Sequence, residues 1–450
     1  MILDYFLTEF QKCKDDEAIF WRNRYFSYDF LLNEYHKCKN WLKKNKIQKG
    51  AVVVIEADFS PKAIALMLAM IEMKCIIVPI TKSVKNKKKD FIQISESEKV
   101  ISIDDNDHLT LTGTSINANN EIYRHLRTTD SPGLVLFSSG STGKSKASVH
   151  DFLPLLNKYK VKRKTLRTIT FLLYDHIGGI NTLFYVLSNC GLIVTIEKRD
   201  PRSVLNTIDK CKVELLPTSP TFINLMLISE AYKDYDLNSL KLITYGTEPM
   251  PEITLKKFNK IFPKIKLRQT YGLSEVGILS SKSEKSNSLW VKIGGDGFQT
   301  RIVNDMLEIK ASSAMLGYLN AESPYTKDGW FKTGDLVEVK GEYIKILGRK
   351  SEIINVGGEK VYPQEVENII MEVENIAEAT VFSEKNIILG NYVCAKVSLL
   401  DMKRDLELEK KKIKAHCLSM LERYKVPIKI NISQEKQFGG RFKKKRSIIS

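Results

Sequence analysis

The sequence predicts an α/β protein with a large N-terminal domain and a small α+β domain at the C-terminus. A chain of 450 residues exceeds the size at which one hydrophobic core usually stops growing. Two runs of alternating strands and helices are followed by short strands with glycine turns over residues 286–348. We therefore expect an N-terminal domain over residues 1–348, made of two βα lobes and a small β subdomain, and a C-terminal domain over residues 349–450.

The first lobe is predicted from apolar spacing. Residues 15–48 carry apolar side chains three and four positions apart, which is typical of an amphipathic helix. Residues 51–55 and 75–80 are short apolar runs that indicate strands. Between them a Ser-Pro pair begins a predicted helix over residues 62–73. Strand, helix and strand at this spacing form a parallel α/β unit.

The second lobe repeats this alternation. Strands are predicted over residues 168–174, 192–196 and 240–245, with helices over residues 180–187 and 203–211. Ligands of open α/β sheets bind beyond the carboxyl ends of the parallel strands. The two lobes should therefore form a cleft at those ends.

The stretch LFSSGSTGKSK over residues 136–146 is the strongest local signal for a ligand. It follows an apolar strand and then turns to small, hydroxylic and basic residues. Glycines let backbone N–H groups approach a phosphate, hydroxyls donate, and lysine neutralises charge. We expect this loop to hold the β- and γ-phosphates of ATP, through Ser138, Ser139, Gly140, Ser141, Thr142, Gly143 and Lys146.

Two other interpretations of this loop are open. Gly143-Lys144-Ser145 matches the end of a Walker pattern, but Ser138 stands where its first glycine belongs. That mismatch argues against a P-loop kinase or GTPase. A plain Ser/Gly-rich surface turn is the second alternative.

The composition indicates a globular protein of the cytoplasm. No apolar run is long enough to span a bilayer, and the first residues lack the basic start and apolar core of a secretory signal. The seven cysteines are scattered singly without metal or redox spacing. We therefore expect reduced thiols, with neither a zinc site nor a disulfide framework.

The formal charge of +17 raises the question of nucleic-acid binding. The lysines are spread along the whole chain, and no zinc finger, RNP-type strand or heptad basic region accompanies them. Solvated lysine-rich faces account for the charge, so no nucleic-acid partner is expected.

Four further stretches give the chain a family resemblance: TYGLSE over residues 270–275, GWFKTGDL over 329–336, GRKS over 348–351 and VGGEKVYPQEVE over 356–367. Together with the loop over residues 136–146, they resemble the ordered signature of the adenylate-forming superfamily. That superfamily contains acyl- and aryl-CoA synthetases, peptide-synthetase adenylation domains and luciferases. The resemblance runs from about residue 20 to the C-terminus.

The resemblance implies an ATP-dependent ligase that forms acyl-AMP and pyrophosphate from a small-molecule carboxylic acid. The acyl group would then pass to the thiol of coenzyme A or of a carrier-protein phosphopantetheine. The C-terminal domain would be mobile and turn between the two steps. A degenerate member that binds nucleotide or acyl-adenylate without turnover is an alternative, as is an amino-acid-adenylating ligase.

The resemblance also implies roles for individual residues. Glu275 would be the Mg²⁺ ligand, and Ser274 would contact the α-phosphate. The remaining nucleotide contacts, to adenine, ribose or phosphate, would come from Gly246, Thr247, Glu248, Tyr271, Gly272, Asp335 and Arg349. Structural alternatives are open for some of them. The Ser274-Glu275 pair could be a helix cap, Tyr271 a core aromatic residue and Asp335 a turn residue.

His176 is expected to border the acyl site. The stretch DHIGG over residues 175–179 resembles the histidine-glycine stretch of the CoA-ligase branch, which favours a fatty or aromatic acid. Amino-acid-activating relatives carry an aspartate there, and Asp175 lies one position away. The acid pocket would be lined by His176, Pro220, Phe222, Gly246, Gly272, Val276 and Gly277.

The tail departs from the family pattern. Relatives end with a glycine-lysine-x-x-arginine segment whose lysine serves adenylation, whereas this chain reads GGRFKKKR over residues 439–446. Aligning lysine and arginine makes Lys443 the catalytic lysine, and aligning the glycine puts Arg441 there. We favour Lys443, because guanidinium is a poor substitute for a compact ammonium. A plain basic tail is the alternative.

Overall fold

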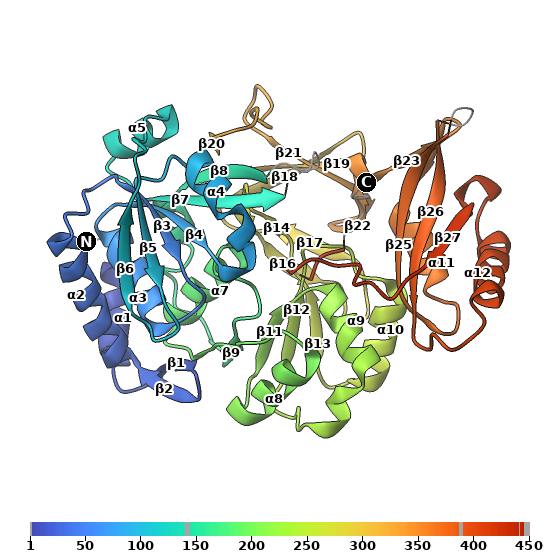
Figure 1. The fold of residues 1–450 in the computed structure, drawn as a ribbon, viewed down its shortest axis with the longest axis horizontal. Helices are drawn as coiled ribbons and strands as arrows, with labels where there is room; N and C mark the ends of the chain where they lie inside the picture. The colour runs from blue at the N-terminus through green and yellow to red at the C-terminus, as the bar shows by residue number, and fades with distance from the viewer. Residues whose placement is uncertain (1, 140–144, 387–389, 441, 445–450) are drawn as a thin grey trace.

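The computed structural model describes residues 2–139, 145–386, 390–440 and 442–444 (Figure 1). Within these residues, two seven-stranded sheets and a six-stranded sheet form the N-terminal domain, and a three-stranded sheet forms the centre of the C-terminal domain. The predicted α/β fold with a large and a small domain is confirmed. In the described part of the chain, no helix is long and apolar enough to cross a membrane.

The first sheet has the strand order β20-β8-β7-β4-β3-β5-β6. Strands β7, β4, β3 and β5 run parallel, and β6, β8 and β20 add antiparallel edges. Its strands are β3 (Val52–Glu56), β4 (Ile76–Ile80), β5 (Lys99–Ile103), β6 (Leu109–Gly113), β7 (Gly133–Ser139), β8 (Ser145–Asp151) and β20 (Gly317–Tyr318). The helices of this lobe are α2 (Tyr28–Lys44), α3 (Pro61–Glu72), α4 (Lys88–Ile94), α5 (Glu121–Thr128) and α6 (Phe152–Asn157).

The second sheet has the order β13-β12-β11-β9-β10-β1-β2 and is parallel except for the edge strand β2. Its strands are β1 (Glu17–Trp21), β2 (Arg24–Ser27), β9 (Thr168–Ile169), β10 (Ile193–Val194), β11 (Leu215–Thr218), β12 (Leu242–Tyr245) and β13 (Lys266–Gln269). The helices are α1 (Asp4–Lys12), α7 (Ile177–Leu187), α8 (Pro201–Cys211), α9 (Pro220–Ser229) and α10 (Glu252–Ile261).

The β subdomain is a six-stranded sheet in which every pair is antiparallel. It contains β16 (Ser280–Ser283), β17 (Val291–Gly294), β18 (Phe298–Val303), β19 (Met306–Ala311), β21 (Phe331–Lys340) and β22 (Tyr343–Arg349). A short hairpin, β14 (Gly272–Leu273) with β15 (Gly277–Ile278), connects it to the second lobe.

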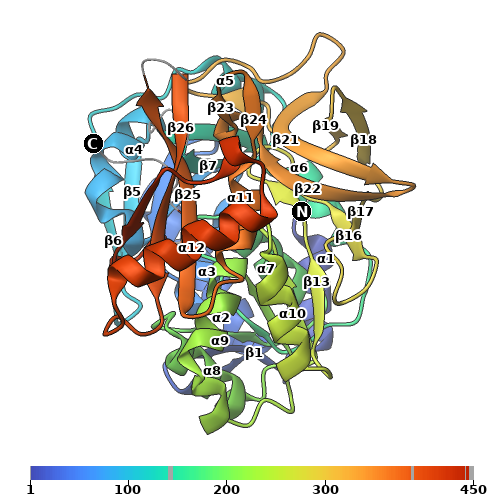
Figure 2. The ribbon, with the colours of Figure 1, turned by 90° about the vertical axis from the view of Figure 1, so that its right-hand side faces the viewer.

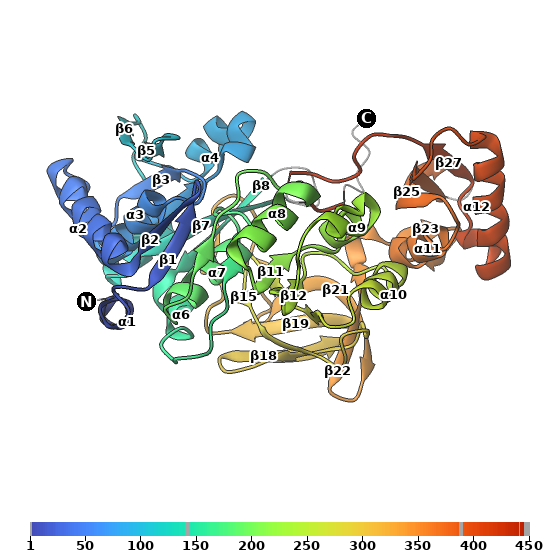
Figure 3. The ribbon, with the colours of Figure 1, turned by 90° about the horizontal axis from the view of Figure 1, so that it is seen from below.

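The C-terminal domain packs two helices on a three-stranded sheet with its own apolar core. It contains β23 (Ile354–Val356), β24 (Glu359–Val361), α11 (Pro363–Ile370), β25 (Ile376–Asn386), β26 (Gly390–Leu399), α12 (Leu406–Met420) and β27 (Lys429–Ile432). Figure 2, which faces this end of the molecule, shows α12 crossing in front of β25 and β26. After β27 the chain turns back towards α9 of the N-terminal domain (Figure 3).

Two predicted elements differ from the structure. Residues 15–27, included in the predicted amphipathic helix, form the hairpin β1–β2, and the helix α2 begins at Tyr28, where Ser27 caps it. The predicted strand over residues 168–174 is regular only over β9, because the chain then turns into the cap of α7.

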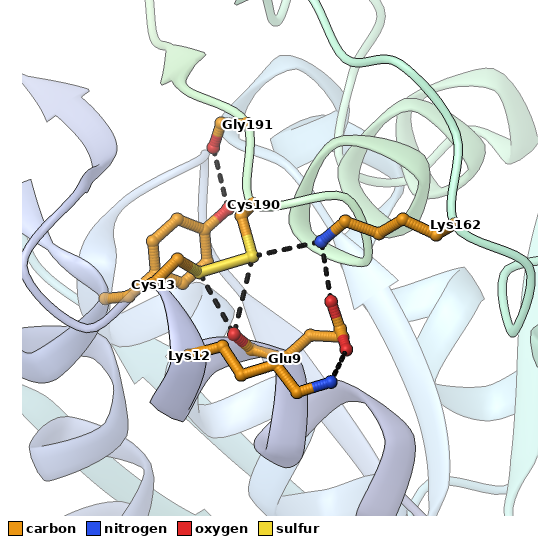
Figure 4. The surroundings of a disulfide bond; sticks show 7 residues. Glu9, Lys12, Cys13, Lys162, Cys190 and Gly191 are labelled. Atoms are coloured by element: carbon orange, nitrogen blue, oxygen red, sulfur yellow. Dashed lines mark hydrogen bonds and ion pairs between the residues drawn. A yellow bond between two sulfur atoms is a disulfide. The ribbon is translucent and has the colours of Figure 1, made fainter.

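The expectation of reduced thiols throughout is wrong for one pair. Cys13 and Cys190 form a disulfide with their Cα atoms 6.2 Å apart, and it joins the end of α1 to the loop after α7 (Figure 4). Glu9 lies beside the bond and pairs with Lys12 and Lys162. The two cysteines are 177 positions apart, so no local spacing could indicate their contact. The other five cysteines are free and buried.

Candidate functional site: a cavity between the second lobe and the β subdomain

A small cavity of about 70 Å³ lies at the carboxyl ends of β12 and β13, against the end of β22. Groups from five separate stretches of the chain line it. Among its lining residues are Gly246, Thr247, Glu248, Tyr271, Gly272, Asp335, Arg349, Glu352 and Lys443. The carboxyl edge of a parallel sheet is where the alternation of strands and helices predicts a ligand site.

Asp335 is the buried carboxylate of this cavity. Its Oδ2 accepts a hydrogen bond of 2.5 Å from the Tyr271 hydroxyl, and its Oδ1 lies 3.3 Å from Nε of Arg349. Burial raises the pKa of Asp335, and the guanidinium of Arg349 opposes that rise. Burial likewise raises the pKa of Tyr271 well above its usual value, with the Asp335 charge adding to the effect. The residues expected at adenine and ribose thus contact each other.

The loop after β12 approaches the cavity closely. A Cβ atom at Gly246 would lie 2.7 Å from the carbonyl oxygen of Thr270, so only glycine fits there. Thr247 has a φ of +74°, and Glu248 follows with both carboxylate oxygens bound. Its Oε1 accepts from the Thr221 amide at 2.9 Å, and its Oε2 accepts from the Lys444 amide at 3.0 Å. Glu248 therefore fixes the loop to α9 and to the tail.

Ser274 and Glu275 lie in the turn between β14 and β15, beside the cavity. Neither Ser274 nor Glu275 is among the described residues that line the cavity. The carbonyl oxygen of Ser274 lies 2.6 Å from Nε2 of the buried His150, and Oε1 of Glu275 accepts from the Tyr318 hydroxyl at 2.8 Å. The Ser138 hydroxyl is 3.4 Å from the same Oε1. This carboxylate therefore lies next to the strand that leads into the predicted phosphate loop.

The predicted phosphate loop is described only at its two ends. Gly140, Ser141, Thr142 and Gly143 lie outside the described residues, as does Lys144. Strands β7 and β8 pair up to Ser139 and Ser145, so the loop joins the ends of an antiparallel hairpin. Ser138 is opposite Lys146, and the Lys146 ammonium lies 5.3 Å from the centre of the Tyr318 ring. Tyr318 thus contacts both Glu275 and Lys146.

The predicted acid pocket is only partly assembled at this cavity. Gly246 and Gly272 line it, whereas His176, Pro220, Phe222, Val276 and Gly277 are not among its described lining residues. His176 caps α7 instead, with its Nδ1 accepting from the Gly178 amide at 3.0 Å. Phe222 lies in the core of the second lobe, where it contacts Phe171. The expectation that these side chains surround one pocket is not met by this cavity.

Lys443 reaches the cavity from the C-terminal tail. Burial lowers the pKa of its ammonium, and the nearby Arg349 adds to the effect, while Glu352, Glu248 and Asp335 oppose it. The competing candidate, Arg441, lies outside the described residues. The next residue, Lys444, points elsewhere and pairs with Glu367 of α11 at 2.9 Å.

Several contributors to the site were not identified in the sequence, and Glu352 of the cavity lining is one of them. Tyr318 carries no local signal, because β20 joins β8 from far along the chain. Phe442 and Lys444 stand in a basic tail whose contacts depend on how the two domains meet. Glu248, three positions after the end of β12, could be predicted only through the family resemblance.

Sequence families match most of the chain. The family described as AMP-binding enzyme matches residues 6–310, and the AMP-binding enzyme C-terminal domain matches residues 365–438. Among similar curated proteins, indoleacetate–CoA ligase of Aromatoleum aromaticum is 29% identical over 66% of this chain and 62% of its own length. Long-chain-fatty-acid–CoA ligase of Bacillus subtilis is 29% identical over 60% of this chain and 51% of its own length.

Solved structures share the fold across nearly the whole chain. The anthranilate CoA ligase AuaEII in complex with anthranoyl-AMP has a TM-score of 0.84 at 17% identity, covering 98% of this chain and 95% of its own. ATP-bound MatB from Rhodopseudomonas palustris has a TM-score of 0.79 at 20% identity, covering 98% and 97%. The matched segment spans between about half and three-fifths of the curated relatives' length. The chain belongs to the AMP-binding enzyme family.

Proposed function

We propose that this chain joins a carboxylic acid to a thiol in two steps that consume ATP. In the first step a carboxylate oxygen attacks the α-phosphorus, the bond to the pyrophosphate oxygen breaks, and acyl-AMP forms. In the second a thiolate attacks the acyl carbonyl, the acyl–oxygen bond breaks, and AMP leaves. One observation carries the proposal: Tyr271, Asp335, Arg349 and Lys443 meet in one cavity with the glycine loop after β12.

Four side chains of the cavity and the loop after β12 have tasks in the first step. Asp335 accepts two protein donors, and an ionised carboxylate has the capacity to accept the ribose hydroxyls as well. Arg349 and Lys443 bring positive charge to the α-phosphate, where attack by an anion must overcome repulsion. Tyr271 and the loop of Gly246, Thr247 and Glu248 would enclose the adenine.

The β- and γ-phosphates would lie at the end of the β7–β8 hairpin. The groups that we assign to them are Ser138, Ser139, Gly140, Ser141, Thr142, Gly143 and Lys146. Ser274 would contact the α-phosphate. The tyrosine that joins Glu275 and Lys146 supports the idea that both face one triphosphate.

Glu275 suits a magnesium ion that ATP itself brings. Among the residues that the structure describes, no group of three or more histidine, cysteine or acidic side chains is placed to hold a metal. Mg²⁺ commonly binds through one or two carboxylates together with substrate phosphates and water. The chemistry of a single carboxylate beside the phosphate hairpin fits that pattern. When bound, the ion would neutralise charge on the leaving pyrophosphate.

Nucleotide entry requires movement of a lining element. A cavity of about 70 Å³ is far below the roughly 300–1,000 Å³ of small-molecule sites. The part best suited to move is the C-terminal domain, which supplies Lys443 and follows β22. The family resemblance places the hinge at Ser351, which lies in the short 3-10 turn Lys350–Glu352 directly after β22.

For the acid, we propose a fatty or aromatic carboxylate. The names of the relatives support this class, because they include indoleacetate and long-chain fatty acids. His176 caps α7 in this arrangement, so its place at the acyl group stays a prediction. The acceptor thiol is that of coenzyme A or of a carrier-protein phosphopantetheine.

The test is acid-dependent exchange of labelled pyrophosphate into ATP, run over a panel of fatty, aryl and amino acids. We expect exchange with at least one fatty or aryl acid and none without an acid. With that acid, coenzyme A and a phosphopantetheinylated carrier protein are compared as acceptors by mass spectrometry. ATP binding without exchange, and without acyl-AMP in a single turnover, would instead indicate a binding protein that has lost catalysis.

A further inference from the structure

The tail over residues 438–444 connects the two domains around Lys443. Figures 1 and 3 show it running back from the C-terminal domain along α9. The amide of Gly439 donates to the carbonyl of Lys443 at 3.0 Å, and the amide of Phe442 donates to the carbonyl of Gly439 at 2.9 Å. These bonds close a tight turn immediately before the lysine that enters the cavity.

On one side of Lys443, Phe442 is bound to the N-terminal domain. Its ring centre lies 5.3 Å from that of Phe171 and 5.5 Å from that of Phe222, and it also stacks on Phe438. Phe442 has a φ of +51°, a conformation that bulky residues seldom adopt. A strained backbone conformation of this kind persists only where surrounding contacts hold it in place. The ring contacts of Phe442 with Phe171, Phe222 and Phe438 supply these contacts.

On the other side, Lys444 is bound to both domains at once. Its ammonium lies 2.9 Å from Glu367 and 2.9 Å from the carbonyl of Ala379, both in the C-terminal domain. Its backbone amide donates to Glu248, whose loop lines the cavity. The side chain of Glu367 is fully buried and that of Lys444 is 10% exposed, so neither charge can turn to water when its partner is lost.

Lys443 is therefore held between two anchors that point away from the cavity. We propose that Phe442 and Lys444 are positioning residues that fix the ammonium of Lys443 at the reacting phosphate. This inference rests on the proposed function, in which Lys443 serves the first step alone. Because misplacement by about 1 Å can cost roughly 100-fold in rate, loss of either anchor would lower the rate through the position of Lys443.

The variants are Lys444→Met, which keeps the apolar stem and removes the charge, and Lys444→Met combined with Glu367→Gln, which also removes the charge left buried. Lys436→Met, at an exposed lysine two positions before the tail, is the matched control. We expect Lys444→Met to lower the kcat of pyrophosphate exchange by about 10- to 100-fold, while the KM for ATP changes little. Thiol transfer from supplied acyl-AMP should stay within about twofold of the parent chain. The double variant should recover part of the lost exchange.

A second readout needs no turnover. Lysine labelling by an acylating reagent, followed by peptide mass spectrometry, reports whether Lys443 is held in the cavity. Labelling of Lys443 should rise in Lys444→Met and in Phe442→Ala, and stay unchanged in Lys436→Met. Unchanged labelling in Lys444→Met overturns the inference. So does an equal loss of both half-reactions together with a lower melting temperature, since that would be the effect of a merely structural pair. Absence of exchange in the parent chain would count against the proposed function, whereas the labelling result would still decide the positioning.

Discussion

Lys443 and Lys444 are adjacent residues whose ammonium groups lie in different environments. Lys443 faces Arg349 and Asp335 in the cavity, whereas Lys444 is paired with Glu367 between the domains. We expect Lys443→Ala to lower acyl-AMP formation by about 100-fold or more, since one donor at a developing charge is worth that much. ATP should still bind, as isothermal titration can measure. Lys436→Ala should behave like the parent chain, and full activity of Lys443→Ala would restore Arg441 as the candidate.

Glu378 gives the molecule a pH-dependent stability. Burial raises its pKa to about 7 from an ordinary 4.5; Lys444 opposes the rise, and the carboxylates of Glu248 and Glu367 add to it. Between those values the folded chain keeps a proton that the unfolded chain has released. This group's contribution to stability is therefore complete below about pH 4.5, is lost as pH rises to about 7, and stays constant above that.

Glu378→Gln tests that contribution. The glutamine cannot ionise, so the decrease in the free energy of unfolding from about pH 5 to pH 8 should be smaller than in the parent chain, by up to about 3 kcal/mol. Urea unfolding at the two pH values measures the difference. Equal pH dependence in both proteins would mean that Glu378 titrates normally.

At the scale of elements, the start of α7 leaves no room for a side chain at Gly179. A Cβ atom at Gly179 would lie 1.9 Å from the carbonyl oxygen of Leu173, whereas one at Gly178 would meet only the side chains of Leu172 and His176. The backbone carbonyl of Leu173 cannot move aside as easily as the side chains of Leu172 and His176 can. Gly179→Ala should therefore destabilise the fold by about 3 kcal/mol or more, and Gly178→Ala by less. Chemical denaturation of the two variants side by side decides this, and equal losses would contradict it.

Elements with strong local chemistry could be predicted from the sequence. The helix α3 begins at Pro61 after the Ser60 cap, close to the predicted bounds, and the strands β3 and β4 follow their apolar runs. The hairpin β1–β2 was missed because its residues continue the apolar spacing of α2. Its pairing with β10 depends on a strand more than 170 positions away, which no window of sequence reveals.

Contacts between distant segments of the chain also limited what could be predicted about the site. Tyr271, Asp335, Arg349 and Lys443 could be predicted from family motifs, and all four line one cavity. Their mutual contacts could not, because the hydrogen bond between Tyr271 and Asp335 depends on how β21 meets the second lobe. The prediction for His176 rested on its motif, and in the structure its side chain caps a helix.

At the scale of the whole molecule, the disulfide joins the N-terminal helix to the second lobe. Under denaturing conditions without reductant, we expect an alkylating reagent to label five of the seven cysteines, with Cys13 and Cys190 unlabelled. Reduction should lower the free energy of unfolding by about 2–4 kcal/mol, because the bond closes a long loop. A Cys13→Ser variant should match the reduced parent chain. Labelling of all seven would mean that the thiols are reduced, as the sequence alone suggested.

The tail also determines how this protein can be recombined with its relatives. Phe442 and Lys444 belong to the C-terminal domain, but they also contact the N-terminal domain. The Phe442 ring packs against Phe171 and Phe222, and the Lys444 backbone amide donates a hydrogen bond to Glu248. A chimera cut at the hinge would keep Lys443 and the Lys444–Glu367 pair, but it would lose the contacts of Phe442 and of the Lys444 amide with the N-terminal domain. A working graft should therefore carry Phe171, Phe222 and Glu248 along with the transplanted domain.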